Sequence, residues 1–317
     1  MTVIVTVRNE AASIDALLTA LHAQTVQPAA VLITDAASED TTRQRIAQWH
    51  TDHRHEQPFP LRCWVVKGNR STGRNAAIAA AQTELIAITD AGCSPHPDWL
   101  AVLWDTFCRA AKRQGSRELV VAGYYDASPH TRLETAIVPY FLVMPKKVDP
   151  ATFLPATRSI LLPKIVWQQL GGFSPELDES EDFAFAHAIR AHHIPIHFAA
   201  DAKVTWQPMT SLEAFARTVR RFARSDARAQ LVRPKVLVIF VRYFMLTSVL
   251  WWLIEKGRWA EAVSVFGVLF VLYSAWAIWK NWASARKGWF WLPCLQGVSD
   301  VAVMVGTIQG LFWKGRS

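Results

Sequence analysis

Short apolar runs alternate with amphipathic stretches through the N-terminal part of the chain. Each run has the composition of a buried strand, and the stretch after it carries apolar residues at the spacing of one helical face. Repeated alternation of strands and helices predicts an α/β domain with a mostly parallel sheet and right-handed crossovers. The runs that predict strands are residues 3–7, 30–34, 61–66, 85–88 and 119–122.

The pattern changes after residue 233, where the sequence becomes almost continuously apolar. The first two apolar stretches are each about as long as a helix must be to cross the hydrocarbon core of a membrane. Tryptophans gather near the ends of the stretches, as at a membrane interface. The third is a weaker candidate, because it contains Pro293, Gln296 and Asp300. The candidate spans are residues 236–254, 262–279 and 289–313.

The chain of 317 residues is therefore expected to have two domains, a soluble one over residues 1–233 and a membrane domain over residues 234–317 with two to three transmembrane helices. Lys and Arg, which give a net charge of +8, are dense before the first span and after the second. Because such loops stay on the cytoplasmic side, this predicts a multi-pass protein of the cell (inner) membrane with its soluble domain in the cytoplasm. Membrane lipids are expected partners, and nucleic acid is not, since no recognition module accompanies the basic residues.

Two ionisable residues, Arg242 and Asp300, lie inside predicted spans. Charged groups at this depth are costly and are usually paired or functional. We expect these two to pair with each other or to line a groove for an acceptor. Arg242 could equally extend its charged end toward the membrane interface.

The stretch GNRSTGRNAAIAAAQTELIAITDAG, residues 68–92, carries the strongest chemical signal. A basic turn leads into a helix, and the following buried strand ends at Asp90. In an open α/β sheet ligands bind at the carboxyl ends of the strands, so an acid there can hold a ribose hydroxyl or a divalent cation that bridges phosphates. The guanidinium groups of Arg70 and Arg74 suit phosphate oxygens. Together these residues predict a site for a nucleotide sugar.

Five segments in this order resemble the inverting glycosyltransferases of family 2, which have the Rossmann-like GT-A fold. The resemblance covers about residues 3–229. A looser sixth match, TVRRF, lies where processive members carry a Q-x-x-R-W motif, and Thr218 replaces the glutamine. That departure favours transfer of a single sugar over polymer synthesis. The five segments are VIVTVRNE, ITDAASEDTT, GNRSTGRNAA, ITDAG and GGFSPELDESEDFAFAHAIR.

The resemblance implies roles in binding the nucleotide sugar. Asp35 matches the acid that usually contacts the base, although an acid there could equally cap the next helix. The two arginines of the third segment match positions near the diphosphate, and solvated surface arginines would look the same in sequence. Arg221 of the sixth match could meet the diphosphate or a lipid headgroup. The residues expected to bind the nucleotide sugar are Thr6, Arg8, Glu10, Asp35, Arg70, Arg74, Asp90 and Arg221.

Two acids are expected to carry the chemistry. Asp182 matches the general base of the family, and the alternative is a solvated helix N-terminus, where acids are favoured by the helix dipole. Asp90 stands at the D-x-D motif, but Gly92 replaces its second acid. We expect Asp90 to hold Mg²⁺ or Mn²⁺ together with the diphosphate. The alternative is that Asp90 binds the ribose and arginines neutralise the leaving group without a metal.

The sequence thus predicts a membrane-anchored glycosyltransferase that moves a sugar from a nucleotide-diphosphate donor to a lipid-linked or membrane-proximal acceptor. Two alternatives stay open. In one, the acceptor is polyprenyl phosphate itself. In the other, the chain is a non-catalytic membrane scaffold that retains nucleotide binding, as the incomplete acidic pair at Asp90 and Gly92 suggests.

Overall fold

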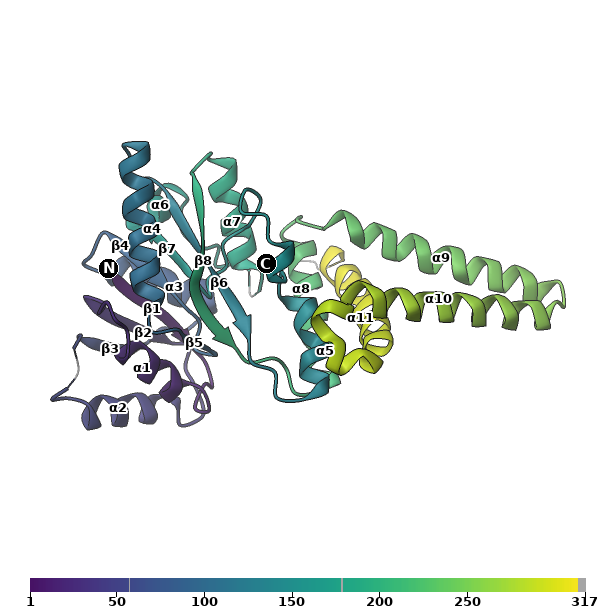
Figure 1. Ribbon diagram of the computed structural model, residues 1–317, viewed down its shortest axis with the longest axis horizontal. Coiled ribbons are helices and arrows are strands. Elements are labelled where there is room, and N and C mark those ends of the chain that lie inside the picture. Colours follow the sequence, from purple (N-terminus) through teal and green to yellow (C-terminus); the bar gives the residue numbers. More distant parts are fainter. Residues whose placement is uncertain (57, 178, 313–317) are drawn as a thin grey trace. The chain divides into compact units, whose positions relative to one another are not determined.

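The computed structural model describes residues 1–56, 58–177 and 179–312, which divide into two compact units (Figure 1). The first unit comprises Met1–Ser128 and Pro145–Gln207, and the second comprises Pro129–Met144 and Pro208–Ser317. Residues 129–144 and 208–233 therefore pack with the C-terminal helices. The predicted domain boundary between residues 233 and 234 marks a change in composition, whereas the packing divides the chain at other residues. That residues 1–233 form the functional glycosyltransferase domain stays a prediction.

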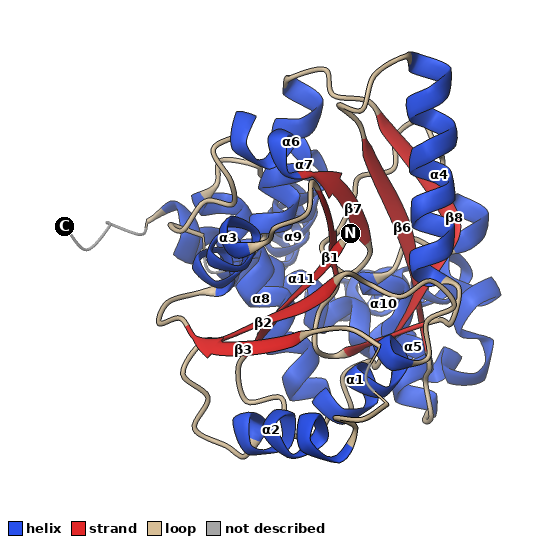
Figure 2. Cartoon of the chain, turned by 90° about the vertical axis from the view of Figure 1, so that its left-hand side faces the viewer, coloured by secondary structure: helices blue, strands red, loops and turns tan. Residues whose placement is uncertain are grey.

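In the described part of the first unit, eight strands form one sheet with the order β3-β2-β1-β4-β7-β6-β8-β5 (Figure 2). Strands β1 to β4 are mutually parallel, as predicted. Strand β7 is antiparallel to both of its neighbours, and β5 is antiparallel to β8, so the sheet as a whole is mixed. The strands are β1 Thr2–Val7, β2 Ala30–Asp35, β3 Leu61–Val65, β4 Leu85–Ile88, β5 Cys93–Pro95, β6 Val120–Ala127, β7 Ile160–Pro163 and β8 Ile196–Trp206.

Alternate strand residues point into a buried core that helices of this unit cover. Side chains such as Ile4, Leu32 and Ile86 pack there with residues of α3, α6 and α7. Helix α4 packs on β6, β7 and β8. The helices of the unit are α1 Ile14–His22, α2 Thr42–Asp52, α3 Arg70–Ala80, α4 Trp99–Gln114, α6 Lys164–Gln169 and α7 Glu181–Ala191, with a 3₁₀ turn η1 Pro145–Lys147.

Helix α3 lies unusually close to the strands because it contains Gly73. A Cβ atom at this position would lie 2.8 Å from Oγ1 of Thr34 and 3.1 Å from Cγ2 of Thr6. The first of these distances is shorter than side-chain contacts allow, so only glycine fits without a shift of the helix or strands. This close approach places the start of α3, with its two arginines, at the carboxyl edge of the sheet.

The second unit is helical. Helices α9 and α10 lie side by side (Figure 1) and expose large apolar side chains, including Phe244 at 73% and Trp279 at 78%. Among the described residues, two helices, Pro234–Glu255 and one within Trp259–Leu311, are long and apolar enough to cross a membrane, which fits membrane anchoring. The elements are α5 Arg132–Phe141, α8 Leu212–Arg228, α9 Pro234–Glu255, α10 Trp259–Ala285, η2 Arg286–Trp291 and α11 Leu292–Leu311.

The third predicted span differs from the other two. It begins in η2 and continues as α11, while Trp313 lies outside the described residues. Helix α11 packs along α8, and Cβ atoms at Gly306 and Gly310 would lie 2.3 Å and 2.4 Å from carbonyl oxygens of that helix. One face of α11 is thus buried against a polar helix rather than exposed as in α9 and α10.

Candidate active site

The carboxyl ends of three parallel strands bring acidic residues to one edge of the sheet. Asp90 follows β4, whose residues are all buried between β1 and β7. Glu10 follows β1, and Asp35 is the last residue of β2. This edge is where open α/β sheets bind their ligands. The sequence prediction that Asp90 emerges at this edge is confirmed.

Arg74 lies at the centre of the site. Its side chain is 1% exposed, and its Nη2 donates a 2.9 Å hydrogen bond to Oδ1 of Asp90. Its Nη1 donates to Glu181 at the start of α7. Burial alone would lower the pKa of Arg74, but the two carboxylates raise it, so the guanidinium stays charged. The alternative of a solvated surface arginine is wrong for this residue. Its contact with a diphosphate stays a prediction.

Asp90 carries a stable negative charge. Burial opposes its ionisation, but the guanidiniums of Arg74 and Arg158 outweigh this effect and lower the pKa of the carboxyl. Arg158 Nε lies 4.0 Å from Oδ2 of Asp90. The same guanidinium lies over the rings of Tyr125 and Trp206, at 4.7 Å and 5.0 Å from their centroids. Asp90 therefore sits between two cations that the protein holds in place.

Asp182 has the opposite electrostatic environment. It is the second residue of α7, and its Oδ1 accepts a 2.8 Å hydrogen bond from the backbone N–H of Phe183. Burial raises the pKa of its carboxyl to about 6, and the neighbouring charge of Glu181 adds to the shift. A carboxyl with this pKa is mostly ionised at neutral pH yet basic enough to accept a proton.

Glu10 and Arg70 belong to the same electrostatic cluster. Burial raises the pKa of Glu10, while a hydrogen bond from Ser13 and the charge of Arg70 partly oppose the shift. The Arg70 side chain is 53% exposed, and its Nη1 lies 3.1 Å from Oε2 of Glu179. Arg70 is thus more accessible to a ligand than Arg74.

Asp35 is fully buried beside this cluster. Its oxygens accept hydrogen bonds from the backbone N–H and the hydroxyl of Ser38, and Arg43 Nε lies 3.4 Å away. The Ser38 hydroxyl also accepts a 2.9 Å hydrogen bond from the backbone N–H of Asn9, which ties the loops after β1 and β2 together. Asp35 thus holds its own loop, and it does not cap α2, whose N-cap is Thr41, so the capping alternative is wrong. The contact of Asp35 with a nucleoside stays a prediction.

The remaining predicted site residues are Thr6, Arg8 and Arg221. Thr6 is partly exposed on β1 and lies against Gly73, and Arg8 is exposed just after that strand. Arg221 is an exposed residue of α8 in the second unit. The roles of these three residues in binding a nucleotide sugar stay predictions.

Arg158 is the site residue that sequence reasoning missed. It comes just before β7, which is antiparallel to β4 with Ile160 opposite Ile88. Residues before the start of one strand and after the end of an antiparallel neighbour meet at the same edge of a sheet. Arg158 therefore faces Asp90. The only signal in the sequence was an arginine two residues before an apolar run, and the sequence did not show in which direction that strand crosses the sheet.

Asp90 is the carboxylate that was predicted to hold a divalent cation. Asp90 Oδ1 accepts from Arg74, and its side chain is 34% exposed. A Cβ atom at Gly92 would have nothing within 4 Å, so the position of the missing second acid faces open space. Across residues 1–56, 58–177 and 179–312, no three His, Cys, Asp or Glu side chains cluster to hold a metal. Because Mg²⁺ often uses one or two carboxylates with substrate phosphates, this donor set fits a cation held jointly with a diphosphate.

Comparisons with known proteins concern the sequence and the fold of the chain. The sequence model described as "Glycosyl transferase family 2" matches residues 2–170. No curated protein matches the chain.

Solved structures share the fold. The mannosyltransferase PcManGT from Pyrobaculum calidifontis, in complex with GDP-Man and Mn²⁺, is 18% identical over 98% of this chain and 86% of its own, with a TM-score of 0.61. S. aureus TarS 1–349 in complex with UDP-GlcNAc is 15% identical over 99% of this chain and 93% of its own, with a TM-score of 0.51. The chain spans only 38% of the longer S. aureus TarS structure.

Proposed function

The chain belongs to glycosyl transferase family 2, and from this membership we propose that it transfers one sugar, with inversion, from a nucleotide-diphosphate donor to a lipid-linked or membrane-proximal acceptor. It is a glycosyltransferase with the GT-A fold. Structures of this fold hold GDP-Man and UDP-GlcNAc, which supports a nucleotide-sugar donor. The two long apolar helices support an acceptor at a membrane. The Lys and Arg residues before the first span and after the second support a cytoplasmic catalytic unit.

The observation that carries this proposal is the contrast between two carboxylates. The pKa of Asp90 is lowered by two guanidiniums, whereas the pKa of Asp182 is raised to about 6 by burial and by Glu181. Catalytic sites often contain two acids whose surroundings give them different pKa values, and each acid then has its own role in catalysis. We infer that Asp90 stays ionised and takes part in binding, whereas Asp182 accepts a proton.

Transfer would take place in a single displacement. Asp182 accepts the proton of the acceptor hydroxyl while that oxygen bonds to the anomeric carbon, and the bond from this carbon to the diphosphate oxygen breaks. Arg70, which is half exposed, and Arg158, which lies beside Asp90, would stabilise the negative charge on the departing nucleoside diphosphate. Arg74 holds Asp90 and Glu181 in position. Asp35 and the loop it organises would receive the nucleoside.

Asp90 is the residue that would hold Mg²⁺ or Mn²⁺. A cation bound by Asp90 and the diphosphate would neutralise charge on the leaving group. The Mn²⁺ in the structure of PcManGT supports this proposal.

Sugar transfer by the purified full chain is expected to fall at acid pH. With Asp182 as base, kcat/KM should rise with pH through an apparent pKa near 6 and should drop about tenfold for each pH unit below it, because the protonated carboxyl accepts no proton. The assay measures initial rates in detergent with a panel of nucleotide sugars, a membrane-lipid extract, and Mg²⁺ or Mn²⁺. Activity recovered on return to neutral pH excludes unfolding. A profile that stays flat down to about pH 4.5 would overturn the proposed base.

A further inference from the structure

Helix α8 carries five arginines on one face. They occupy positions i, i+3, i+4, i+7 and i+11, which is the spacing of neighbours along one side of an α-helix. The opposite side is apolar and includes Phe215, which is fully buried. Because charged side chains are costly in the hydrocarbon core of a membrane, a helix with this many arginines is expected to lie outside that core. The arginines are Arg217, Arg220, Arg221, Arg224 and Arg228.

Helix α11 runs along α8 for most of its length. Phe215, near the start of α8, belongs to the same buried cluster as Leu295 near the start of α11. Near the other end, a Cβ atom at Gly310 would lie 2.4 Å from the carbonyl oxygen of Arg224. The contacts proceed in the same direction along both helices, so α11 is parallel to α8. A helix held against α8 over this length cannot at the same time cross the hydrocarbon core.

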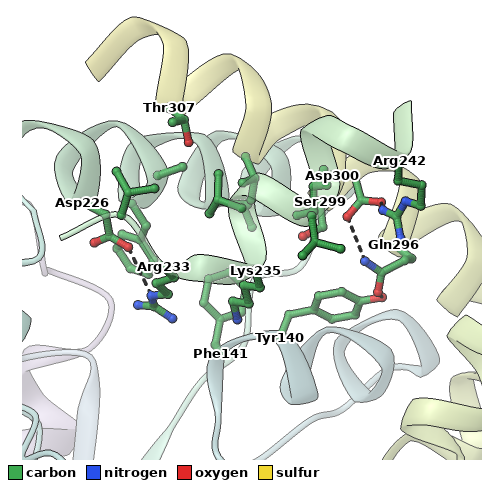
Figure 3. A pocket seen from close by; sticks show the side chains of 18 of the residues that line it. Tyr140, Phe141, Asp226, Arg233, Lys235, Arg242, Gln296, Ser299, Asp300 and Thr307 are labelled. Atoms are coloured by element: carbon green, nitrogen blue, oxygen red, sulfur yellow. Dashed lines mark hydrogen bonds and ion pairs between the residues drawn. The ribbon is translucent and has the colours of Figure 1, made fainter. Parts of the chain in front are cut away.

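The middle of α11 is bound to both long apolar helices. Asp300 is 1% exposed and accepts hydrogen bonds from Arg242 of α9 and from the hydroxyl of Tyr273 of α10, the latter at 2.5 Å. Nε2 of Gln296 also donates to Asp300, at 3.0 Å (Figure 3). The pairing of Arg242 with Asp300, one of the outcomes expected from the sequence, is confirmed. These contacts hold α11 against the two candidate spans while it also packs on α8.

A further side of α11 is apolar and exposed. Four large side chains recur there at the spacing of one helical face and are 38–80% exposed. Hydrocarbon is a better surrounding than water for such a stripe. Because α9 and α10 expose large apolar side chains in the same unit, the lipid that surrounds those helices can also cover α11. The apolar stripe consists of Val301, Val305, Ile308 and Phe312.

We propose that α11 lies in the plane of the membrane, at the boundary between headgroups and hydrocarbon, with the apolar stripe turned toward the lipid chains. Helices of this kind bury one apolar face by about 5–10 Å and leave the other face outside the core. In the described part of the chain, α9 and α10 are then the two spans, and the chain after α11 stays on the side of α8. This goes beyond the proposed function, because neither the donor site nor the transfer step depends on how α11 meets the membrane.

The depth of spin labels in a bilayer tests the proposal. Single cysteines replace the four residues of the apolar stripe, one at a time, in the full chain with its native cysteines changed to alanine. Each labelled chain is reconstituted into vesicles of phosphatidylcholine and phosphatidylglycerol. Collision rates of the label with oxygen and with a water-soluble nickel chelate give its depth.

We expect the four labels to lie within about 4 Å of one common depth, because a helix in the membrane plane keeps one face level. An upright helix rises about 1.5 Å per residue, so Val301 and Phe312 would differ in depth by about 16 Å if α11 crossed the bilayer. A difference of that size would overturn the proposal.

Two labels on α9 are the matched control. Val238 and Phe244 are six residues apart on a proposed span, so Phe244 should lie deeper by about 9 Å. Equal depths there would remove α9 as a span and with it the proposal. Labels on α11 that meet the nickel chelate as freely as a label at Lys112, an exposed residue of the first unit, would place α11 in water. Labels shielded from both reagents would show that protein, such as a second copy, covers the stripe. Either result would overturn the proposal.

The side on which the chain continues after α11 gives a second test, which keeps the native cysteines. Lys256→Cys lies in the exposed turn between α9 and α10, and Ser317→Cys follows α11. A membrane-impermeant maleimide is added to spheroplasts before or after permeabilisation, and the labelled peptides are identified by mass spectrometry. We expect the two positions to be labelled from opposite sides. Labelling of both from the same side would show that α11 crosses the membrane. Neither experiment measures turnover, so a negative result would leave the proposed sugar transfer intact.

Discussion

Replacing Asp182 by asparagine is expected to lower kcat for sugar transfer by about 10²–10⁴-fold while leaving nucleotide-sugar binding nearly unchanged. The amide has the shape of the carboxyl and can keep the contact with the backbone of Phe183, but it accepts no proton from the acceptor. Donor affinity should persist because the cations nearest the proposed diphosphate position, Arg70 and Arg158, remain in place. Initial rates and a separate titration with the donor measure the two effects.

A matched variant makes this result specific. Glu176 belongs to the same acidic segment but is exposed, so Glu176→Gln removes an equal charge without touching the site. It should retain nearly full activity. An Asp182→Asn variant with more than about half of the original kcat would show that another group takes the proton. Loss of donor binding together with activity would assign Asp182 to binding instead.

Replacing Arg74 by methionine is expected to have the largest effect on stability. The change leaves the carboxylates of Asp90 and Glu181 without the guanidinium that pairs with both, and the Glu181 side chain is only 4% exposed. Removing one partner of a buried ion pair typically costs about 3–5 kcal/mol in the free energy of unfolding. Since Arg74 also lowers the pKa of Asp182, its loss should move the acid limb of the pH profile to higher pH.

Arg70→Met is the control for that measurement. The pair of Arg70 with Glu179 is 3.1 Å long, but the arginine is 53% exposed, so its removal should cost only about 0–1 kcal/mol. Chemical denaturation of both variants in the same detergent gives the comparison. Equal stability of the two variants would mean that Arg74 does not hold the two acids in place.

Local patterns in the sequence were sufficient to predict the four parallel strands β1 to β4. Strands β1 to β3 are short apolar runs that are each followed by a helix, and β4 is a buried apolar run that is followed by an acid. An acid after a buried parallel strand lies at the ligand-binding edge of the sheet, so Asp90 could be placed from the local sequence alone. Helices α9 and α10 could also be predicted from the sequence, because their length and apolar composition alone identify them as candidate membrane spans.

Long-range contacts could not be predicted in this way. The position of Arg158 depends on β7 running antiparallel to β4, and a four-residue apolar strand carries no information about its direction. The burial of Arg74 depends on Glu181, 107 residues later in the chain. Likewise, the packing of α11 on α8 depends on close backbone approach at Gly306 and Gly310, which hydropathy does not detect.

The anomeric configuration of the product tests the proposed chemistry most directly. A single displacement with Asp182 as base gives a product whose configuration is opposite to that of the nucleotide sugar, whichever sugar and acceptor are used. The one-bond carbon–proton coupling constant at the anomeric carbon, in the NMR spectrum of the purified glycolipid, distinguishes the two configurations. We predict inversion. A product with the configuration of the donor would contradict transfer in one displacement and with it the role of Asp182.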